Sequence, residues 1–475
     1  MQDTAPDISA GDGLGSASGD VPVPRYPIDA FLGAIGDVPT SVEATDRKRK
    51  SRDFFWYSPP LNALLKDKVA DAIVAARDEG DVVRVAAACA RFRIPLTVRG
   101  GATGNYGQCV PLEGGVVLDI TGLSALEWSR PGAVRVGAGA KMDKLDRELQ
   151  PTGFEQRMHP STKRSATVGG FVAGGSGGVG SVTYGGLREP GNILAARVVS
   201  LETTPRIVEL RGDAAQKINR AYGTTGIMTA LEMPLAPAWP WIDVVFAFDD
   251  FLDAVRFGRT LAMADGVVKK LLSAVAWPLP SYFGAFRRHC PDGKHLVLAM
   301  IAENSLETCK SLLEGARGEV SHEMPSDDSP GTTPLYEFAW NHTTLQVLKS
   351  DRAVTYLQCL FPHDRLLDTV EGVNARFGSE LMQHLEFIRF GGQVTASALP
   401  VVRYSTPERL DEMIALHEDA GIMIANPHVF TLEDGSRHKR ADADQIGFKH
   451  EIDPLGLLNP GKMRSFVSRL SGAAR

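Results

Sequence analysis

Apolar and polar positions in the second half of the chain follow a repeating order of strand and then helix. Each unit begins with a short apolar run, which is typical of a buried strand, and continues with a stretch of helical period. Four such units favour one sheet covered by helices on a single face. The expected strands are 241–248, 295–302, 353–361 and 385–402, and the expected helices are 249–263, 305–316, 363–377 and 406–420.

The first half of the chain has shorter elements, and two glycine clusters interrupt them. The pattern predicts helices over 81–92 and 142–149. Apolar runs predict strands at 94–98, 114–120, 133–139, 193–201, 206–210 and 225–233.

The longer glycine cluster, residues 160–191, is the most unusual stretch of the sequence. It contains ten glycines, yet apolar residues such as Phe171 and Val172 lie among them. A flexible linker would be polar and rich in Ser and Gly. Glycine backbone approaches a bound group closely because it has no Cβ. The segment is therefore expected to be buried against a ligand.

Two short motifs inside this cluster suggest other functions. Residues 175–180 fit the dinucleotide pattern GxGxxG, and residues 174–178 fit GxSxG, the nucleophile elbow of hydrolases. Both motifs require a helix to open at the glycines, and the following residues 179–186 form a poor helix pattern. A nicotinamide-linked enzyme and a serine hydrolase are therefore minority hypotheses.

The upstream cluster, residues 98–108, combines consecutive glycines with Thr103 and Asn105. Such a run can turn successive N–H groups inward and form an anion-binding nest. An anion nest together with a second wrapped backbone suggests an extended cofactor that carries phosphate.

At this point the sequence resembles the FAD-linked oxidases of the vanillyl-alcohol oxidase and D-lactate/glycolate dehydrogenase type. In that family a loop close to RGGGTG cradles the FAD pyrophosphate, and Arg99–Gly104 match it with Ala102 as the one change. Three further family motifs follow in order: ATVGG…GG…G…YG at 166–185, GxxGIxT at 223–229, and DPxGxLNPGK at 453–462. The matches span most of the chain.

The resemblance implies an α+β fold: a two-subdomain FAD-binding domain of the PCMH type and an α+β cap with a single antiparallel sheet. We expect a disordered or extended tail at 1–40, the FAD-binding domain at 41–236, the cap at 237–420, and a return to the FAD-binding domain at 421–475. The implied FAD-binding residues are Arg99, Gly100, Gly101, Ala102, Thr103, Gly104, Asn105, Gly107, Pro160, Thr167, Gly169, Gly170, Gly174, Gly177, Ser181, Tyr184, Gly185, Gly226, Ile227 and Asn459.

The chemistry that the resemblance implies is oxidation of an alcohol or 2-hydroxy acid, with hydride transfer to flavin N5 and a base that takes the hydroxyl proton. His428 and His342 are the predicted bases because both lie in polar or aromatic surroundings. Arg389, flanked by apolar residues on an expected strand, is the predicted carboxylate partner. A phenolic or aromatic alcohol is the alternative substrate, and a redox-silent flavin-binding protein is the alternative of a different class.

Departures from the family change two expectations. The metal-binding HxGDGNxH of the lactate/glycolate branch is replaced by residues 389–395 without a His pair, so no metal is expected. Residues 99–107 contain no His, and residues 160–191 contain neither His nor Cys, so non-covalent FAD is expected. A His of the cap, such as His342, is the remaining attachment point.

The composition of the chain excludes some partners and locations but does not identify a function. The chain has 475 residues, 43% of them hydrophobic, and a formal net charge of −6, so nucleic acid is not an expected partner. Residues 1–24 lack the apolar core of a signal peptide, and no stretch approaches a membrane span. Five scattered cysteines favour reduced thiols and a cytoplasmic location. The electron acceptor is expected to be O2 or another carrier, and a homodimer is the default assembly.

Overall fold

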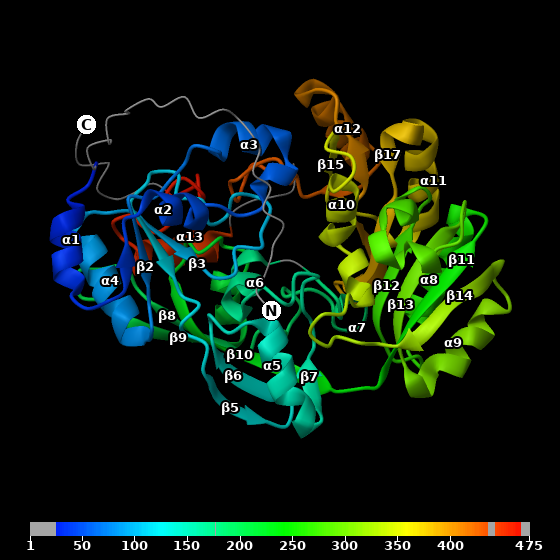
Figure 1. Cartoon of the computed structure of the whole chain (residues 1–475), viewed down its shortest axis with the longest axis horizontal. Coiled ribbons are helices and arrows are strands. Elements are labelled where there is room, and N and C mark those ends of the chain that lie inside the picture. The colour runs from blue at the N-terminus through cyan, green and yellow to red at the C-terminus, as the bar shows by residue number, and fades with distance from the viewer. Residues whose placement is uncertain (1–24, 176, 436–441, 467–475) are drawn as a thin grey trace.

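The computed structural model describes residues 25–175, 177–435 and 442–466, and in these the chain forms two bodies side by side (Figure 1). The first body holds the beginning of the described chain and its last helix, α13 (Ala443–Ile452). The second body consists of residues 241–424 and is called the cap here. The chain thus leaves the first body once and returns to it.

The first body contains two sheets that share one apolar core. In the four-stranded sheet, β2, β4 and β3 are parallel and β1 is antiparallel to β2. Asp78 is the N-cap residue of helix α4, and its side chain accepts the N–H of Asp81. The strands in spatial order are β1 (Thr40–Ser41), β2 (Ala72–Ala75), β4 (Val116–Asp119) and β3 (Leu96–Arg99), and the helices before and between them are α1 (Ile28–Ile35), α2 (Ala44–Lys50), α3 (Pro59–Leu65) and α4 (Glu79–Phe92).

The second sheet of this body is antiparallel and is built around its long strand β10 (Ile227–Pro237). Its other strands are β5 (Leu126–Arg130), β6 (Ala133–Gly137), β8 (Ala195–Val199), β9 (Ile207–Arg211) and β7 (Phe154–Gln156). Three helices lie between strands β6 and β8 in the chain: α5 (Met142–Leu149), α6 (Val168–Gly174) and α7 (Ser181–Tyr184).

The cap is built on an eight-stranded antiparallel sheet. Helices α8 (Phe251–Met263), α9 (Leu306–Leu313), α11 (Leu366–Phe377) and α12 (Pro407–Asp419) share one apolar cluster with it. The strands in spatial order are β14 (Gly318–Pro325), β11 (Trp241–Phe248), β13 (His295–Ala302), β12 (Lys269–Val275), β18 (His384–Phe390), β19 (Gln393–Ala398), β16 (Cys359–Leu360) and β21 (Met423–Ile424).

The other face of the cap sheet is covered as well, which corrects the expectation of helices on a single face. Helix α10 (Asn341–Leu348) and the turn before it pack there against alternate residues of the same strands, such as Val245 and Leu298. A second, three-stranded sheet of β15 (Val354–Tyr356), β20 (Val401–Arg403) and β17 (Leu381–Met382) corrects the expectation of a single sheet.

Two strand predictions in the cap are wrong in detail because turns interrupt apolar runs. The expected strand 385–402 is a hairpin, β18 and β19, that turns at Gly391 and Gly392, both with positive φ, and then continues into β20. The expected strand 353–361 is divided between the two cap sheets. Strands β12 and β14 were not predicted.

The domain boundaries differ from the expected ones at two places. Of the expected tail, residues 1–24 lie outside the described residues, but α1 packs Phe31 and Ile35 into the core, so the tail prediction is wrong there. Strand β21 still pairs with β16 of the cap, so the return to the first body begins after Ile424 rather than at 421.

Candidate active site

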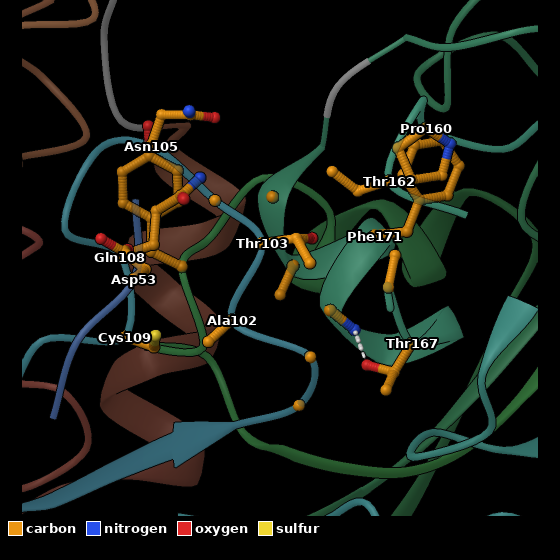
Figure 2. Close-up of a pocket in the computed structure, with 18 of the residues that line it drawn as sticks. Asp53, Ala102, Thr103, Asn105, Gln108, Cys109, Pro160, Thr162, Thr167 and Phe171 are labelled. Atoms are coloured by element: carbon orange, nitrogen blue, oxygen red, sulfur yellow. Dashed lines mark hydrogen bonds between the residues drawn. The ribbon is translucent and has the colours of Figure 1, made fainter. Parts of the chain in front are cut away.

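The two glycine segments form opposite walls of one cleft (Figure 2). The first wall comes from the loop after β3, with Ala102, Thr103 and Asn105; the second comes from Pro160 through α6, with Thr167 and Phe171. Cap residues close one end, and the cavity measures ≈ 190 Å³. The shared cleft that the sequence predicted is therefore present.

The first loop presents backbone donors to this cavity. Among the described residues, none accepts a hydrogen bond from the backbone N–H groups of residues 101–105. Ala102, where the resembled family has glycine, nevertheless adopts a left-handed φ of 51°. These residues are half-buried along the cavity wall, and a run of unpaired N–H groups there can receive acceptor atoms such as phosphate oxygens.

Close contact between the two walls explains why glycine is needed in the first loop. A Cβ on Gly100 would lie 2.2 Å from Thr167 Oγ1, and a Cβ on Gly101 would lie 2.2 Å from the Ser165 carbonyl oxygen. The Thr167 side chain is itself fixed, because it accepts the N–H of Gly170 at the start of α6 (Figure 2). Any side chain at Gly101 would separate the walls.

The C-terminal motif ties this loop to the rest of the first body. Asn459 Nδ2 donates to the carbonyl oxygens of Gln108 at 2.8 Å and Tyr222 at 2.7 Å. Lys462 Nζ donates to the Gly107 carbonyl oxygen at 2.6 Å. Burial lowers the pKa of Lys462 and raises the pKa of nearby Asp53, which lines the cavity. The motif therefore acts by holding the loop.

The expected cofactor residues fall into two groups. One group lines the cavity: Gly100, Gly101, Ala102, Thr103, Gly104, Asn105, Pro160, Thr167, Gly169, Gly170, Gly174, Gly177 and Gly226. The other group does not line it. Arg99, Gly107 and Asn459 make contacts that hold the first loop, Ile227 lies in the core, and Ser181, Tyr184 and Gly185 belong to the α7 region.

Sequence reasoning missed the residues at the cap end of the cavity. Tyr106 and Tyr222 reach it from the first body, and Trp340, Asn341 and Gln358 reach it from the cap. Tyr222 OH, Trp340 Nε1 and Asn341 Oδ1 are buried without a hydrogen-bond partner in the described structure. Orphaned polar atoms at a cavity wall are ready to bind a ligand. Of these residues, only Trp340 could have been suspected from the sequence, because aromatic residues surround it.

Trp340 is held in an unusual conformation by a buried polar network. Its φ is 52°, and its backbone N–H donates to Glu386 Oε1 at 2.6 Å. The same carboxylate oxygen lies 2.7 Å from His384 Nε2 and accepts the Ser273 hydroxyl at 3.0 Å. Strained backbone of this kind persists where the surroundings over-determine it. Trp340 is thereby fixed where it lines both this cavity and a second, larger one.

His428, the first predicted base, bridges two segments of the protein. Its Nδ1 lies 2.8 Å from Ser58 Oγ, and its Nε2 lies 2.9 Å from the Tyr356 carbonyl oxygen. Because a carbonyl only accepts, Nε2 carries a proton and donates it to the Tyr356 carbonyl oxygen. Burial lowers its pKa to about 4. Both ring nitrogens are therefore engaged with protein atoms.

The other two candidates lie in different places. His342 follows Asn341 on α10, directly after the residues that line the cavity, and burial lowers its pKa to about 4. Arg389 pairs with Asp265 and lines a separate cavity beside α7 and β12. The structure thus does not bring the three candidates together.

Other chemistries find little support in the described part of the chain. No group of three or more His, Cys, Asp or Glu residues in it is arranged to hold a metal ion. None of its helices has the length and apolar character needed to cross a membrane. Gly175 of the GxGxxG match caps the C-terminus of α6 and does not follow a strand, which contradicts a dinucleotide fingerprint. Ser176 of the GxSxG match lies outside the described residues.

Comparisons with known proteins agree with the geometry. Residues 70–206 match the family described as FAD binding domain. A D-lactate dehydrogenase of Archaeoglobus fulgidus is 33% identical over 147 residues, which are 30% of this chain and only 31% of that protein. The glycolate oxidase subunit GlcD of Bacillus subtilis is 25% identical over 424 residues, covering 83% of this chain and 88% of the relative.

A solved structure of alkyldihydroxyacetonephosphate synthase shares the fold, with a TM-score of 0.72, 15% identity, and coverage of 94% of this chain and 86% of that chain. The cleft's unpaired N–H groups and glycine-rich walls fit the phosphate-bearing cofactor of the matched domain. The chain therefore carries an FAD binding domain and has FAD as its cofactor, and it is similar to a D-lactate dehydrogenase and to a glycolate oxidase subunit.

Proposed function

We propose that the protein oxidises 2-hydroxy acids in an FAD-dependent reaction. The observation that carries the proposal is the cleft itself: two glycine-rich walls that fit FAD, closed at one end by cap residues that also line a second cavity. The names D-lactate dehydrogenase and glycolate oxidase among its relatives support a hydroxy acid as substrate.

Bound FAD supplies the acceptor for the hydride that leaves the substrate carbon. The protein must orient the substrate and take its hydroxyl proton. Burial raises the pKa of Tyr106 well above its usual value, so this phenol stays protonated and donates its hydrogen bond to Gln358 Oε1. Tyr106 and Gln358 line both cavities and can position an oxygen of the substrate.

For the proton acceptor we propose His342. It is neutral near pH 7, since burial lowers its pKa to about 4, and it adjoins the cavity wall in sequence. His428 could accept a proton at Nδ1 only by giving up the Ser58 hydroxyl. We propose for His428 the role of a strut between Ser58 and the cap strand β15.

Anaerobic mixing of the FAD-loaded protein with D- and L-2-hydroxy acids tests this proposal. We expect loss of flavin absorbance with one enantiomeric series. His342→Gln is expected to slow this bleaching about 10²- to 10⁴-fold, the usual contribution of a general base. His428→Gln is the matched control, expected to lower thermal stability more than the bleaching rate. Bleaching by aromatic alcohols alone, or by no alcohol at all, would refute the proposed function.

A further inference from the structure

A second cavity of ≈ 540 Å³ adjoins the first between the two bodies. Tyr106, Gly174, Gly177, Trp340 and Gln358 line both, so the cavities meet at the cap end of the cleft. Cavities of roughly 300–1,000 Å³ hold ligands of drug size. The space beside the cap end of the cleft is therefore larger than a three-carbon acid fills.

Two arginines line the second cavity from the first body: Arg188 follows α7, and Arg220 lies between β9 and β10. Within the described residues, neither arginine forms a salt bridge with a carboxylate. The pKa of Arg188 is lowered by burial and by the positive charge of Arg220, although Asp442 opposes this shift. Two facing cations without an ion-pair partner favour binding of an anion.

The carboxylates of the same cavity are occupied by backbone groups. Glu189 Oε1 accepts the Gly391 N–H at 2.7 Å, and Asp442 caps helix α13 by accepting the Asp444 N–H at 2.9 Å. Gln445 donates to the Asn219 carbonyl oxygen at 2.7 Å. These contacts hold the walls in place, and neither Glu189 nor Asp442 forms a salt bridge with Arg188 or Arg220 in the described structure.

The backbone of Arg220 adopts a strained, left-handed conformation that fixes its position at the cavity. Its φ is 53°, and its N–H donates to the Val172 carbonyl oxygen at 3.0 Å. A Cβ on Gly175 would lie 2.1 Å from Arg220 Cβ, so the glycine of the second segment makes room for it. Non-glycine residues with positive φ are uncommon and often mark functional positions.

The part of the cavity lining that the cap supplies is largely apolar. Phe390 is 50% exposed and Met423 is 41% exposed, both high for large apolar side chains. Leu360, Ile388 and Ile424 of the cap add to this apolar lining, and Leu187 and Leu432 add to it from the first body. An apolar surface that faces two cations suits an amphipathic anion, one with a carboxylate and a hydrocarbon tail.

We propose that Arg188 and Arg220 bind the carboxylate of 2-hydroxy acids whose apolar side chain, longer than that of lactate, lies against the cap wall around Phe390 and Met423. This inference rests on the proposed oxidation of 2-hydroxy acids. It deepens that proposal by naming a medium-chain aliphatic or aromatic hydroxy acid as the substrate class.

Binding without turnover provides the test. The oxidised, FAD-loaded protein is titrated with pyruvate and with 2-oxooctanoate, and the perturbation of the flavin spectrum gives each Kd. The longer acid is expected to bind at least 10-fold more tightly, since each buried methylene contributes about 4-fold. Equal affinities for the two acids would overturn the role of the apolar wall.

Charge variants test the arginines. Arg188→Gln and Arg220→Gln are each expected to raise both Kd values about 10- to 100-fold, as lost charge-assisted hydrogen bonds do. Arg147→Gln on the exposed face of α5 is the matched control and should leave them unchanged. Met423→Ala is expected to weaken only 2-oxooctanoate.

The outcomes separate the two proposals. Arginine variants that keep their melting temperature and bind both acids like the wild type would overturn the subsite, even if hydroxy acids bleach the flavin. Absence of bleaching in the wild type would instead overturn the oxidation, and the binding measurements would still report on the anion site.

Discussion

Replacing Gly101 with alanine tests whether the contact between the two glycine walls holds the cofactor cleft together. The added Cβ would lie 2.2 Å from the Ser165 carbonyl oxygen and 3.1 Å from Ala166 Cα, both backbone atoms that cannot rotate away. One wall must therefore move by about 1 Å, and such overpacking typically costs about 1–3 kcal/mol. The φ of Gly101 is not in the left-handed region, so space alone opposes the change.

We expect Gly101→Ala to weaken FAD binding about 5- to 150-fold, which is the same free energy expressed as a ratio of dissociation constants. Quenching of flavin fluorescence on titration into the apoprotein measures this Kd, and urea unfolding of the apoprotein measures stability. Gly372→Ala is the control, because that glycine lies within α11 with no atom near its Cβ position. It should stabilise the protein by about 0.5–1 kcal/mol. Wild-type FAD affinity and unfolding for Gly101→Ala would refute the contact argument.

Three further changes test other parts of the structure. Lys462→Met removes the donor to the first loop and should lower the free energy of unfolding by about 1–3 kcal/mol, measured in urea. Asp146 is buried beside a lysine ammonium at 2.8 Å, which holds its pKa below the usual value. Its contribution to stability is therefore present above about pH 4 and is lost as the pH falls through the folded-state pKa. Asp146→Asn should lower stability at pH 7 and flatten the acid side of the stability profile, whereas Glu148→Gln in the exposed Lys144–Glu148 pair should change neither. Trp340→Phe should abolish most of the FAD-dependent quenching of tryptophan fluorescence, while Trp128→Phe on β5, outside the lining of the cleft, should leave it intact.

The residues that the sequence identified without the structure are those whose role is local. Glycines at 100, 101, 169 and 170 matter because they lack a Cβ, which the residue type alone reveals. The order of the family motifs indicated that the two segments meet. Strands such as β11 and β13 were predicted with their observed bounds because apolar runs of eight residues record burial directly.

Residues whose role depends on distant partners could not be found in this way. Nothing near His428 reveals that Ser58, 370 positions earlier, and a carbonyl of β15 occupy both its ring nitrogens. Gln358 and Asn341 gave no signal either, because only the packing of the cap against the first body brings them to the cleft. Titratable groups in particular derive their properties from burial and neighbours, which are properties of the folded chain.

The sequence by itself determined that this chain wraps glycine-rich backbone around an extended cofactor, since missing side chains and their spacing are written in the residue order. The tertiary structure decided which side chains face that cofactor and what adjoins it. A cavity with two arginines on one wall and an apolar cap surface on the other exists only after residues 188, 220, 390 and 423 are packed together. Contacts between residues that far apart depend on how the two bodies dock, and no local pattern encodes that arrangement.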